Sequence, residues 1–326
     1  MFAAWLFLAF FGLALAGVPL LYALLGTTVG AIVVAGLSHP LETIFLSFIG
    51  GVEPFILIAV PLFIFAGEIL SSGGVGRRIV DFARALLGFL PGGLGVVTVA
   101  SCLMFGGVSG SAIADTAAIG SLVIPAMVQR GYSRGFAAAL LAVAGTLALL
   151  MPLSIPFLVY AFISGVSMRQ LSMAGIAPAI IAGAALMAVC VWHGRRTGCD
   201  SGDGRLSARE VWKATKAAGP ALLMPLIIVG GIWSGFFTPT ESAAVAVVYG
   251  IVVSLAFYRD ITVRDLPRLL VNAFQTSATV MLVIGATGAL AWLITVEQVA
   301  VQMAAWIRVI ASEPWQFLLL VNVILL

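Results

Sequence analysis

The stretch Gly106–Pro156 decides the fold: it reads GGVSGSAIADTAAIGSLVIPAM, passes through a short basic turn at 129–134, and ends in FAAALLAVAGTLALLMPLSIP. Long apolar runs surround it, but glycine, serine and proline interrupt it at 106–111 and again at 145–156. Gly and Pro weaken or remove helical hydrogen bonds, so the backbone at these breaks needs other partners. In a bilayer, such backbone is tolerated where protein buries it or where it lines a watery cavity. Paired breaks therefore indicate the ion and substrate site of a secondary transporter.

The composition predicts an all-α polytopic membrane protein. Of the 326 residues, 62% are hydrophobic and only 9% are charged, whereas soluble proteins average roughly 25% charged residues. The first apolar run, from Phe2, lacks a basic leader and a cleavage site, so we interpret it as a retained helix. Cys102, Cys190 and Cys199 show no metal-binding spacing. We found no nucleotide-binding loop or nucleophile motif, and we expect no cofactor and no nucleic-acid partner.

The lengths of the apolar runs suggest where the chain turns within the membrane. A single crossing needs about 20 residues, and the run 93–128 is too long for one crossing. Because the Gly-Ser break lies in its middle, we interpret 91–130 as a re-entrant helical hairpin. We expect a broken helix at 135–165 and a further helix at 171–194. Residues 4–36 predict two short helices split at Gly17-Val18-Pro19.

The basic residues predict the orientation. Of the 16 Lys and Arg residues, 14 lie in four segments that we place on one face of the membrane: 74–90, 129–134, 195–216 and 259–268. Arg169 and Arg308 remain on the other face. Positive charge accumulates in cytoplasmic loops, so the basic face is predicted to be cytoplasmic.

The order of elements predicts an inverted repeat. Residues 1–196 form the first repeat, 197–216 a polar cytoplasmic connector with a short basic helix, and 217–326 a second repeat with the same order of elements. The charge rule places the amphipathic stretch of the first repeat, 74–90, inside and the corresponding stretch of the second repeat, 296–312, outside. The run 315–326 is then the first arm of a second hairpin, and we expect the natural protein to continue beyond it.

The hairpin tip and the second break supply the candidate site. Ser109, Gly110 and Ser111, next to Gly107, offer hydroxyls and carbonyls, hard oxygen ligands that suit a small hard cation; the alternative is close helix packing by small residues. The partner break contains Gly145, Thr146, Pro152, Ser154 and Pro156. An ordinary proline kink is the alternative there, but two prolines around Ser154 favour an unwound segment that meets the tip. We expect the cation ligands to include Ser109, Ser111 and Thr146.

Three acidic residues have a structural interpretation, and two of them, Asp115 and Glu241, have a functional one as well. Asp115 lies one turn past the tip, where a carboxylate within the membrane is costly and usually functional, although it also suits the positive end of its helix. Glu53 precedes Pro54 and is expected to cap the following helix. In Thr238-Pro239-Thr240-Glu241, the Thr and Glu three residues apart predict a capping box; a role of Thr240 and Glu241 in transport is the alternative.

Four segments together resemble the large membrane subunit of tripartite ATP-independent periplasmic (TRAP) transporters. They are PLFIFAGEILSSGGVGRRIVDFARALLGFLPGGLGVVTV (61–99), FGGVSGSAIADTAAIGSLVIPAM (105–127), GYSRGFAAALLAVAGTLALLMPLSIP (131–156) and GFFTPTESAAVAVVYG (235–250). The resemblance runs from about residue 10 to the end. One departure is that Ala148 and Leu153 stand where this family tends to have glycine and a second proline.

The resemblance implies an inverted-repeat, elevator-type secondary transporter of the bacterial inner membrane. It implies sodium-driven import of organic acids such as dicarboxylates or sialic acid, with a small four-helix membrane subunit and a soluble periplasmic substrate-binding protein as partners. The first alternative is a stand-alone elevator-type anion transporter without a binding protein. The second is a membrane-embedded enzyme, but His39 and His193 lie near predicted membrane edges, and no His or Lys lies in the interior of a predicted span to act as a base. We therefore expect a transporter and no catalysis.

Overall fold

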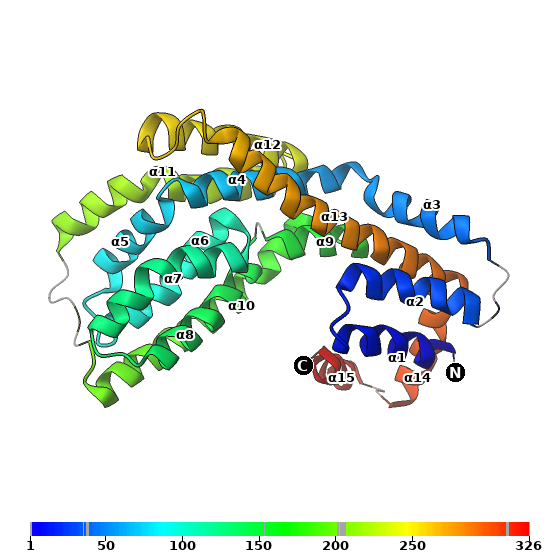
Figure 1. The fold of residues 1–326 in the computed structure, drawn as a ribbon. Helices are drawn as coiled ribbons and strands as arrows, with labels where there is room; N and C mark the ends of the chain where they lie inside the picture. The colour runs from blue at the N-terminus through cyan, green and yellow to red at the C-terminus, as the bar shows by residue number, and fades with distance from the viewer. Residues whose placement is uncertain are drawn as a thin grey trace. The chain divides into compact units, whose positions relative to one another are not determined.

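A computed structural model of the chain describes residues 2–34, 36, 39–152, 154–200, 202, 207–310 and 313–325. These residues form helices and turns without a β-strand (Figure 1). In chain order the α-helices are α1 (Phe2–Leu15), α2 (Leu20–Val34), α3 (Leu41–Val52), α4 (Ala59–Ser72), α5 (Val75–Leu87), α6 (Gly93–Ser109), α7 (Ala112–Gln129), α8 (Arg134–Thr146), α9 (Ile155–Ser164), α10 (Met168–Thr197), α11 (Ala208–Ser234), α12 (Pro239–Val252), α13 (Leu266–Val296), α14 (Val299–Ile310) and α15 (Pro314–Leu325). Two 3-10 turns, η1 (Phe55–Ile58) and η2 (Leu147–Leu150), and a π-helix, η3 (Val253–Tyr258), complete the described structure.

The helix lengths confirm an all-α polytopic membrane protein. Among the described residues, six helices are long and apolar enough to cross a membrane, or seven if the bent α8–α9 pair is one span. The split between α1 and α2 falls at the predicted Gly-Val-Pro sequence. The predicted amphipathic stretch 74–90 contains α5, and α10 includes the predicted helix 171–194.

Two expectations about helix ends are wrong. The basic segment of the connector is not a separate helix: it is the start of α11, which continues for 27 residues into an apolar span. Glu53 does not cap the helix that follows it. Its backbone N–H donates to the carbonyl of Ile49, so Glu53 ends α3, and η1 intervenes before α4.

The chain divides into two compact units by its contacts: unit 1 comprises 1–54 and 278–326, and unit 2 comprises 55–277. This division groups residues by contact, whereas the predicted inverted repeat concerns internal symmetry. The division into repeats at 1–196 and 217–326 therefore stays a prediction, as does the assignment of α15 to a second hairpin.

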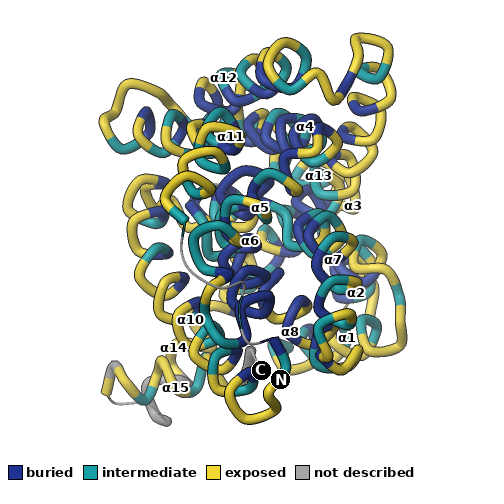
Figure 2. Tube along the Cα trace, turned by 90° about the vertical axis from the view of Figure 1, so that its left-hand side faces the viewer, coloured by how far each residue is buried: buried dark blue, intermediate teal, exposed yellow. Residues whose placement is uncertain are grey.

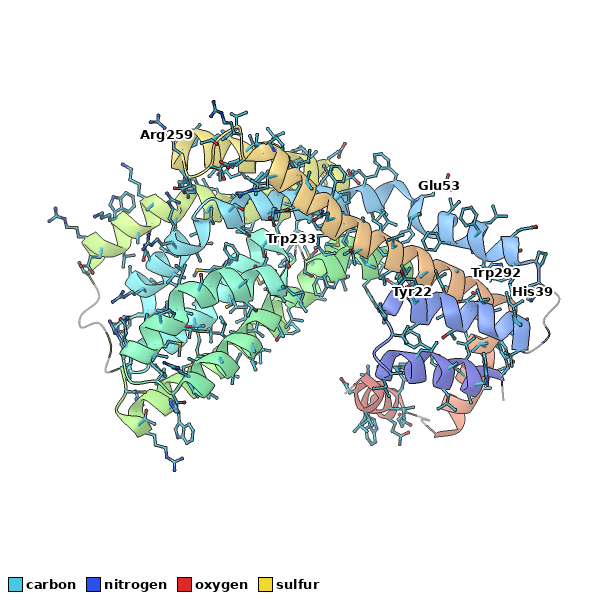
Figure 3. All side chains as sticks on the ribbon, viewed as in Figure 1. Tyr22, His39, Glu53, Trp233, Arg259 and Trp292 are labelled. Atoms are coloured by element: carbon cyan, nitrogen blue, oxygen red, sulfur yellow. The ribbon has the colours of Figure 1, made fainter. Side chains whose placement is uncertain are left out.

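Unit 1 is held together by an apolar cluster of α1, α2, α3 and the second part of α13. Its buried members are Leu6, Leu24, Ala31, Ile32, Ile44, Ala286, Ala289, Leu290 and Leu293. Near one end of the unit, the His39 Nε2 lies 2.9 Å from a carboxylate oxygen of Glu297, and the His39 ring meets the edge of Trp292 (Figure 3).

Unit 2 is built around α6. Nearly every residue of α6 is buried, because α4, α5, α7, α8, α10 and α11 all pack against it. By contrast, α10 alternates buried and exposed residues along its length (Figure 2). The middle of unit 2 therefore holds the hairpin arm that leads to the predicted site.

The predicted orientation can be tested at the two ends of α11. We expect a membrane-impermeant thiol reagent, added from outside, to label a cysteine at Phe236 and to miss one at Trp212, in a background carrying Cys199→Ser. The side chains of Phe236 and Trp212 are 83% and 72% exposed, so access to the reagent depends on the side of the membrane. Labelling of both positions from outside in intact cells would contradict the charge-based topology.

Candidate functional site

In the structure, α6 and α7 pack against each other within the segment predicted to be the hairpin. Near its open end, the Thr98 hydroxyl on α6 lies 3.6 Å from the Met127 sulfur on α7. At the closed end, Gly110 provides the turn with a left-handed backbone (φ 63°), a conformation that glycine adopts without a steric penalty. The return of the hairpin to the same membrane face follows from the charge pattern and stays a prediction.

The tip residues form a compact hydrogen-bonded network. The Ser109 hydroxyl donates to the Oδ1 atom of Asp115 and accepts a hydrogen bond from the Ser111 amide at 3.1 Å. The Ser111 hydroxyl accepts a hydrogen bond from the Ala114 amide at 3.4 Å, so Ser111 is the N-cap of α7. Hydrogen bonds within the turn therefore fix the positions of both tip serines. The bond from Ser109 also holds the Asp115 carboxylate next to the turn.

Asp115 is not the residue that caps α7. Its side chain is fully buried, one oxygen accepts from Ser109, and the other oxygen, Oδ2, has no hydrogen-bond partner among the described residues. An unpaired buried charge is costly unless a proton or a cation neutralises it. The Oδ2 atom is therefore the strongest candidate ligand for a cation at this tip.

The predicted second break is present between α8 and α9. The helix tightens to the 3-10 turn η2 after Thr146, and Met151 and Ser154 adopt extended backbone conformations. The two helical parts meet at an angle of 42°, and Pro156 lies in the first turn of α9, where its missing N–H costs little. Pro152 lies within the break, and Leu153, the predicted departure from the TRAP pattern, lies outside the described residues.

The break and the end of α8 approach the hairpin closely at two glycines. A Cβ atom placed on Gly106 would lie 2.6 Å from the Cα of Ala148 and 3.2 Å from the Oδ2 of Asp115. A Cβ on Gly145 would lie 2.0 Å from the Thr116 hydroxyl. These distances leave no room for a side chain. Glycine at 106 therefore lets η2 approach α6 beside the Asp115 carboxylate, and glycine at 145 lets the end of α8 approach α7.

Other predicted residues lie apart from this network. Gly107 is buried and faces the side chain of Met151, with 3.4 Å between a placed Cβ and the methionine methyl group. Ser154 is buried, and its hydroxyl has no partner among the described residues. Thr146 is exposed and its hydroxyl donates to the carbonyl of Val143 at 2.7 Å, so the structure does not bring Thr146 to the tip. Pro156 is exposed as well.

The capping box predicted before α12 is present. The Thr238 hydroxyl accepts from the Glu241 amide at 3.3 Å, and Oε2 of Glu241 accepts from the Thr238 amide at 2.8 Å. Glu241 is exposed and Thr240 is largely buried. The geometry assigns Glu241 a structural role, and a role of Thr240 or Glu241 in transport stays untested.

Sequence reasoning missed Asp200 and its partners. The carboxylate of Asp200 is fully buried and lies 2.7 Å from Arg130 Nη1, although Asp200 stands in the polar connector. Its Oδ2 also accepts from the Leu94 amide at 2.6 Å and from the Tyr132 hydroxyl at 3.4 Å. Burial, followed by the nearby Asp200 charge, raises the pKa of Tyr132 above its usual range, so Tyr132 stays a hydrogen-bond donor. The basic turn at 129–134 was the only local signal, and it was interpreted as a topology marker.

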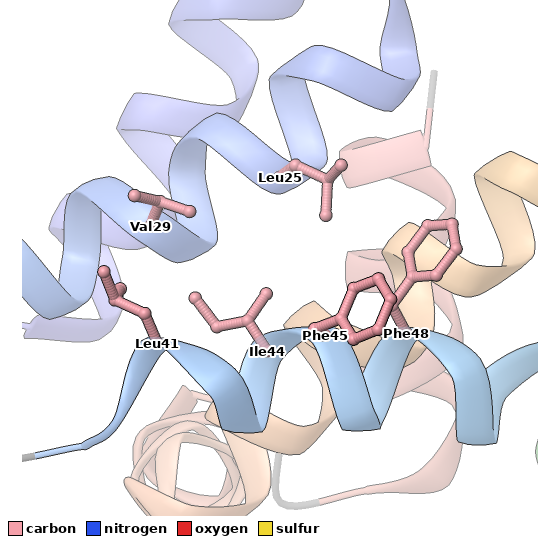
Figure 4. A pocket seen from close by; sticks show the side chains of 6 residues that line it. All are labelled: Leu25, Val29, Leu41, Ile44, Phe45 and Phe48. Carbon is pink, nitrogen blue, oxygen red and sulfur yellow. The ribbon is translucent and has the colours of Figure 1, made fainter.

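An open groove in unit 1 has a different character from the hairpin site. It has a volume of about 380 Å³ and is lined by the apolar side chains Leu25, Val29, Leu41, Ile44, Phe45 and Phe48 of α2 and α3 (Figure 4). These residues offer no hydrogen-bond donor or charge to an organic acid. The groove is therefore a poor candidate for substrate binding.

A tightly ligated transition metal does not fit the described residues, since no three His, Cys, Asp or Glu side chains gather among them. The tip offers one carboxylate oxygen and serine hydroxyls instead. Oxygen donors of this kind suit a hard cation.

A family model described as "Tripartite ATP-independent periplasmic transporter, DctM component" matches residues 7–326. The chain is 39% identical over 274 residues to the C4-dicarboxylate TRAP transporter large permease protein DctM of Pseudomonas aeruginosa, covering 84% of this chain and 64% of the relative. It is 37% identical over 278 residues to the 2,3-diketo-L-gulonate TRAP transporter large permease protein YiaN of Escherichia coli, covering 85% and 65% respectively. It is also 33% identical over 315 residues to the sialic acid TRAP transporter large permease protein SiaM of Vibrio cholerae, covering 97% and 73%.

The matches confirm the resemblance inferred from the four sequence segments. Together with the candidate spans, they confirm the expectation of a multi-pass inner-membrane protein. The relatives are named as permease proteins and not as enzymes, in agreement with the expectation of no catalysis. The aligned part of this chain spans slightly less than two thirds of the length of the P. aeruginosa and E. coli relatives.

Proposed function

The chain belongs to the DctM-component family of tripartite ATP-independent periplasmic transporters, and from this premise we propose that it forms the transport subunit of a cation-coupled importer of small organic acids. The importer receives its substrate from a soluble periplasmic binding protein. The transporting part comprises the α6–α7 hairpin, the broken helix α8–α9 and α10, which move as an elevator against the remaining helices.

The relatives' names support an organic acid as the substrate class. They name C4-dicarboxylate, 2,3-diketo-L-gulonate, isethionate and sialic acid, all of which are acids that ionise at neutral pH. The helices α6, α7 and α9 and the turn η2 contain no Lys or Arg. An entering anion therefore finds no fixed positive charge on these elements, and a bound cation would compensate for it.

The observation that carries cation coupling is the buried, unpaired Oδ2 atom of Asp115 beside Gly106 and Ala148. Importing an anion against an inside-negative potential costs about 2.3 kcal/mol per charge for each 100 mV. Co-import of cations offsets this cost and supplies the driving force. Sodium is the proposed ion, with Asp115, Ser109 and Ser111 as the residues that hold it or shape its site.

The partners proposed are a small four-helix membrane subunit and a periplasmic binding protein. One relative, the isethionate TRAP transporter permease protein DctMQ of Oleidesulfovibrio alaskensis, is 36% identical over 310 residues, and these cover only 49% of its length. Its combined name and extra length support a permease that works with a second membrane component.

The proposal is tested by uptake into proteoliposomes that contain the chain and its small subunit. Labelled C4-dicarboxylate should accumulate when an inward sodium gradient and the binding protein are both present. Accumulation that is unchanged without the sodium gradient would contradict sodium coupling. Full accumulation without the binding protein would instead favour the stand-alone elevator-type transporter.

A further inference from the structure

Asp200 connects three segments at the open end of the hairpin. Its Oδ2 accepts from the Leu94 amide at the start of α6, and its Oδ1 lies 2.7 Å from Arg130 Nη1 at the end of α7. Its main-chain carbonyl accepts from the Gly92 amide at 2.8 Å. Asp200 itself follows α10 and has a left-handed backbone (φ 52°). We call the set Gly92, Leu94, Arg130, Tyr132 and Asp200 the basal latch.

The packing around the basal latch is tight enough to fix the position of α6. A Cβ atom on Gly92 would lie 2.3 Å from the carbonyl oxygen of Cys190, and one on Gly194 would lie 2.5 Å from the Gly92 nitrogen. The backbones of α10 and of the start of α6 are thus in direct contact. The same end of α10 also contacts α8, because the His193 ring stacks on the Phe136 ring at the start of α8, with 3.9 Å between ring centroids.

The electrostatics of the basal latch favour the buried carboxylate. Asp200 lies at the N-terminus of α6, where the helix dipole stabilises a negative charge, and Arg130 supplies a full positive charge. Charge-assisted hydrogen bonds of this kind are about twice as strong as neutral ones. Each accepting oxygen of the Asp200 carboxylate therefore has a partner, in contrast to the Asp115 carboxylate at the tip.

The length of α6 makes its far end sensitive to small movements at its base. With 17 residues, α6 is about 25 Å long. A rotation of about 1° at the base displaces the tip by roughly 0.4 Å, and functional sites need their groups held to within about 0.5 Å. The orientation of α6 at the basal latch therefore affects where Ser109 places its hydroxyl.

We propose that Asp200 is a positioning residue for the cation site: it clamps both bases of the hairpin to the end of α10 and so fixes Ser109 and Asp115 at the tip. This inference rests on the proposed cation-coupled function. Asp200 touches neither the ion nor the substrate, and it acts through α6. The connector thus contributes to the transport machinery at residue 200.

The test compares Asp200→Asn with Asp260→Asn. Asp260 also pairs with an arginine, since its two oxygens accept from Arg78, but among the described residues no hydrogen bond or ion pair joins Asp260 to the hairpin bases. Asp200→Glu serves as the rescue variant because it keeps the charge, and Arg130→Lys serves as a milder change if Asp200→Asn fails to reach the membrane. All variants are made in the full transporter with its partner subunits.

Two readouts separate positioning from general stability. The first is the distance distribution between nitroxide labels on cysteines at Ile113, next to the tip, and Val189 on α10, measured by electron paramagnetic resonance. Both side chains are exposed in the structure, and protein without these two cysteines gives the background. The second readout is the sodium concentration that gives half-maximal uptake.

The expected result is a broadened distance distribution in Asp200→Asn and a half-saturating sodium concentration raised about tenfold, as for other residues that orient ion ligands. Asp260→Asn should change neither, and Asp200→Glu should restore at least part of both. Identical distance distributions in Asp200→Asn and Asp260→Asn would overturn the inference whatever the transport assay gives. A broadened distribution with an unchanged sodium requirement would also overturn it. If uptake by the unaltered protein does not depend on sodium, the coupling proposal is wrong. The distance measurement then still decides whether Asp200 fixes the position of the tip.

Discussion

Uptake is expected to fall to background when Ser109 is replaced by leucine, although the variant still inserts and assembles with its partners. The Ser109 side chain is almost fully buried, and a Cβ atom on Gly67 of α4 would lie 3.0 Å from the Ser109 carbonyl oxygen. Leucine is larger than the buried serine that it replaces, and overpacking of a buried site costs about 1–3 kcal/mol. It also removes the hydroxyl that donates to Asp115, which leaves both carboxylate oxygens without a hydrogen-bond partner in the part of the chain that the structure describes.

Ser121→Leu on α7 is the matched control for this change. Ser121 is exposed and its hydroxyl donates only to the Ala118 carbonyl of its own helix, so this variant should transport normally. Ser109→Ala separates the loss of the hydroxyl from the added bulk and should retain uptake with a weaker response to sodium. Near-normal uptake by Ser109→Leu at matched membrane levels would show that the tip is a packing contact and not a site.

Asp115→Asn is expected to change the cation dependence of uptake more than any other conservative substitution. Asparagine keeps an acceptor for Ser109 but replaces the charged Oδ2 with an uncharged amide. A hydrogen bond or ligand contact to a charged group is worth about 1.5–3 kcal/mol, which corresponds to roughly ten- to more than a hundredfold in half-saturating sodium concentration. The measurement is initial uptake rate against sodium concentration in proteoliposomes.

Asp265→Asn provides the comparison with a carboxylate that caps the turn before α13, where its other oxygen lies 4.0 Å from Arg268. Asp265 is partly exposed, and its Oδ2 accepts from the Thr262 amide at 2.8 Å and the Thr262 hydroxyl at 2.7 Å. Asn caps about as well as Asp, so the sodium dependence of Asp265→Asn should match the unaltered protein. If Asp115→Asn behaves in the same way, the Asp115 carboxylate has a structural role and the proposed ion ligand is wrong.

The features predicted correctly from sequence are those with local causes. Gly110 and the Pro152–Pro156 segment break helices through their own backbone restrictions, and the structure has a turn or break at both places. The capping box of Thr238 and Glu241 forms within four residues, so its spacing identifies it. No knowledge of the tertiary fold is needed for any of these predictions.

The features missed or misplaced depend on packing between distant segments. Asp200 accepts from Leu94, which is 106 residues away in sequence, and from Arg130, which is 70 residues away, so its polar neighbours suggested an exposed loop. Thr146 was grouped with the tip because it follows Gly145. Successive residues of a helix point about 100° apart, so the contact of Gly145 with α7 turns the side chain of Thr146 outward.

The lengths of the helices have a consequence for the membrane itself. With 30 and 31 residues, α10 and α13 are each about 45 Å long, whereas the 14 residues of α1 make about 21 Å. The hydrocarbon core of a bilayer is about 30 Å thick. Long helices tilt or extend into water, and short ones draw the bilayer thinner around them, each at a modest energetic cost. Bilayers of different acyl-chain length therefore shift these costs in opposite directions for a helix as short as α1 and for one as long as α10, which makes membrane thickness a physical variable for this protein.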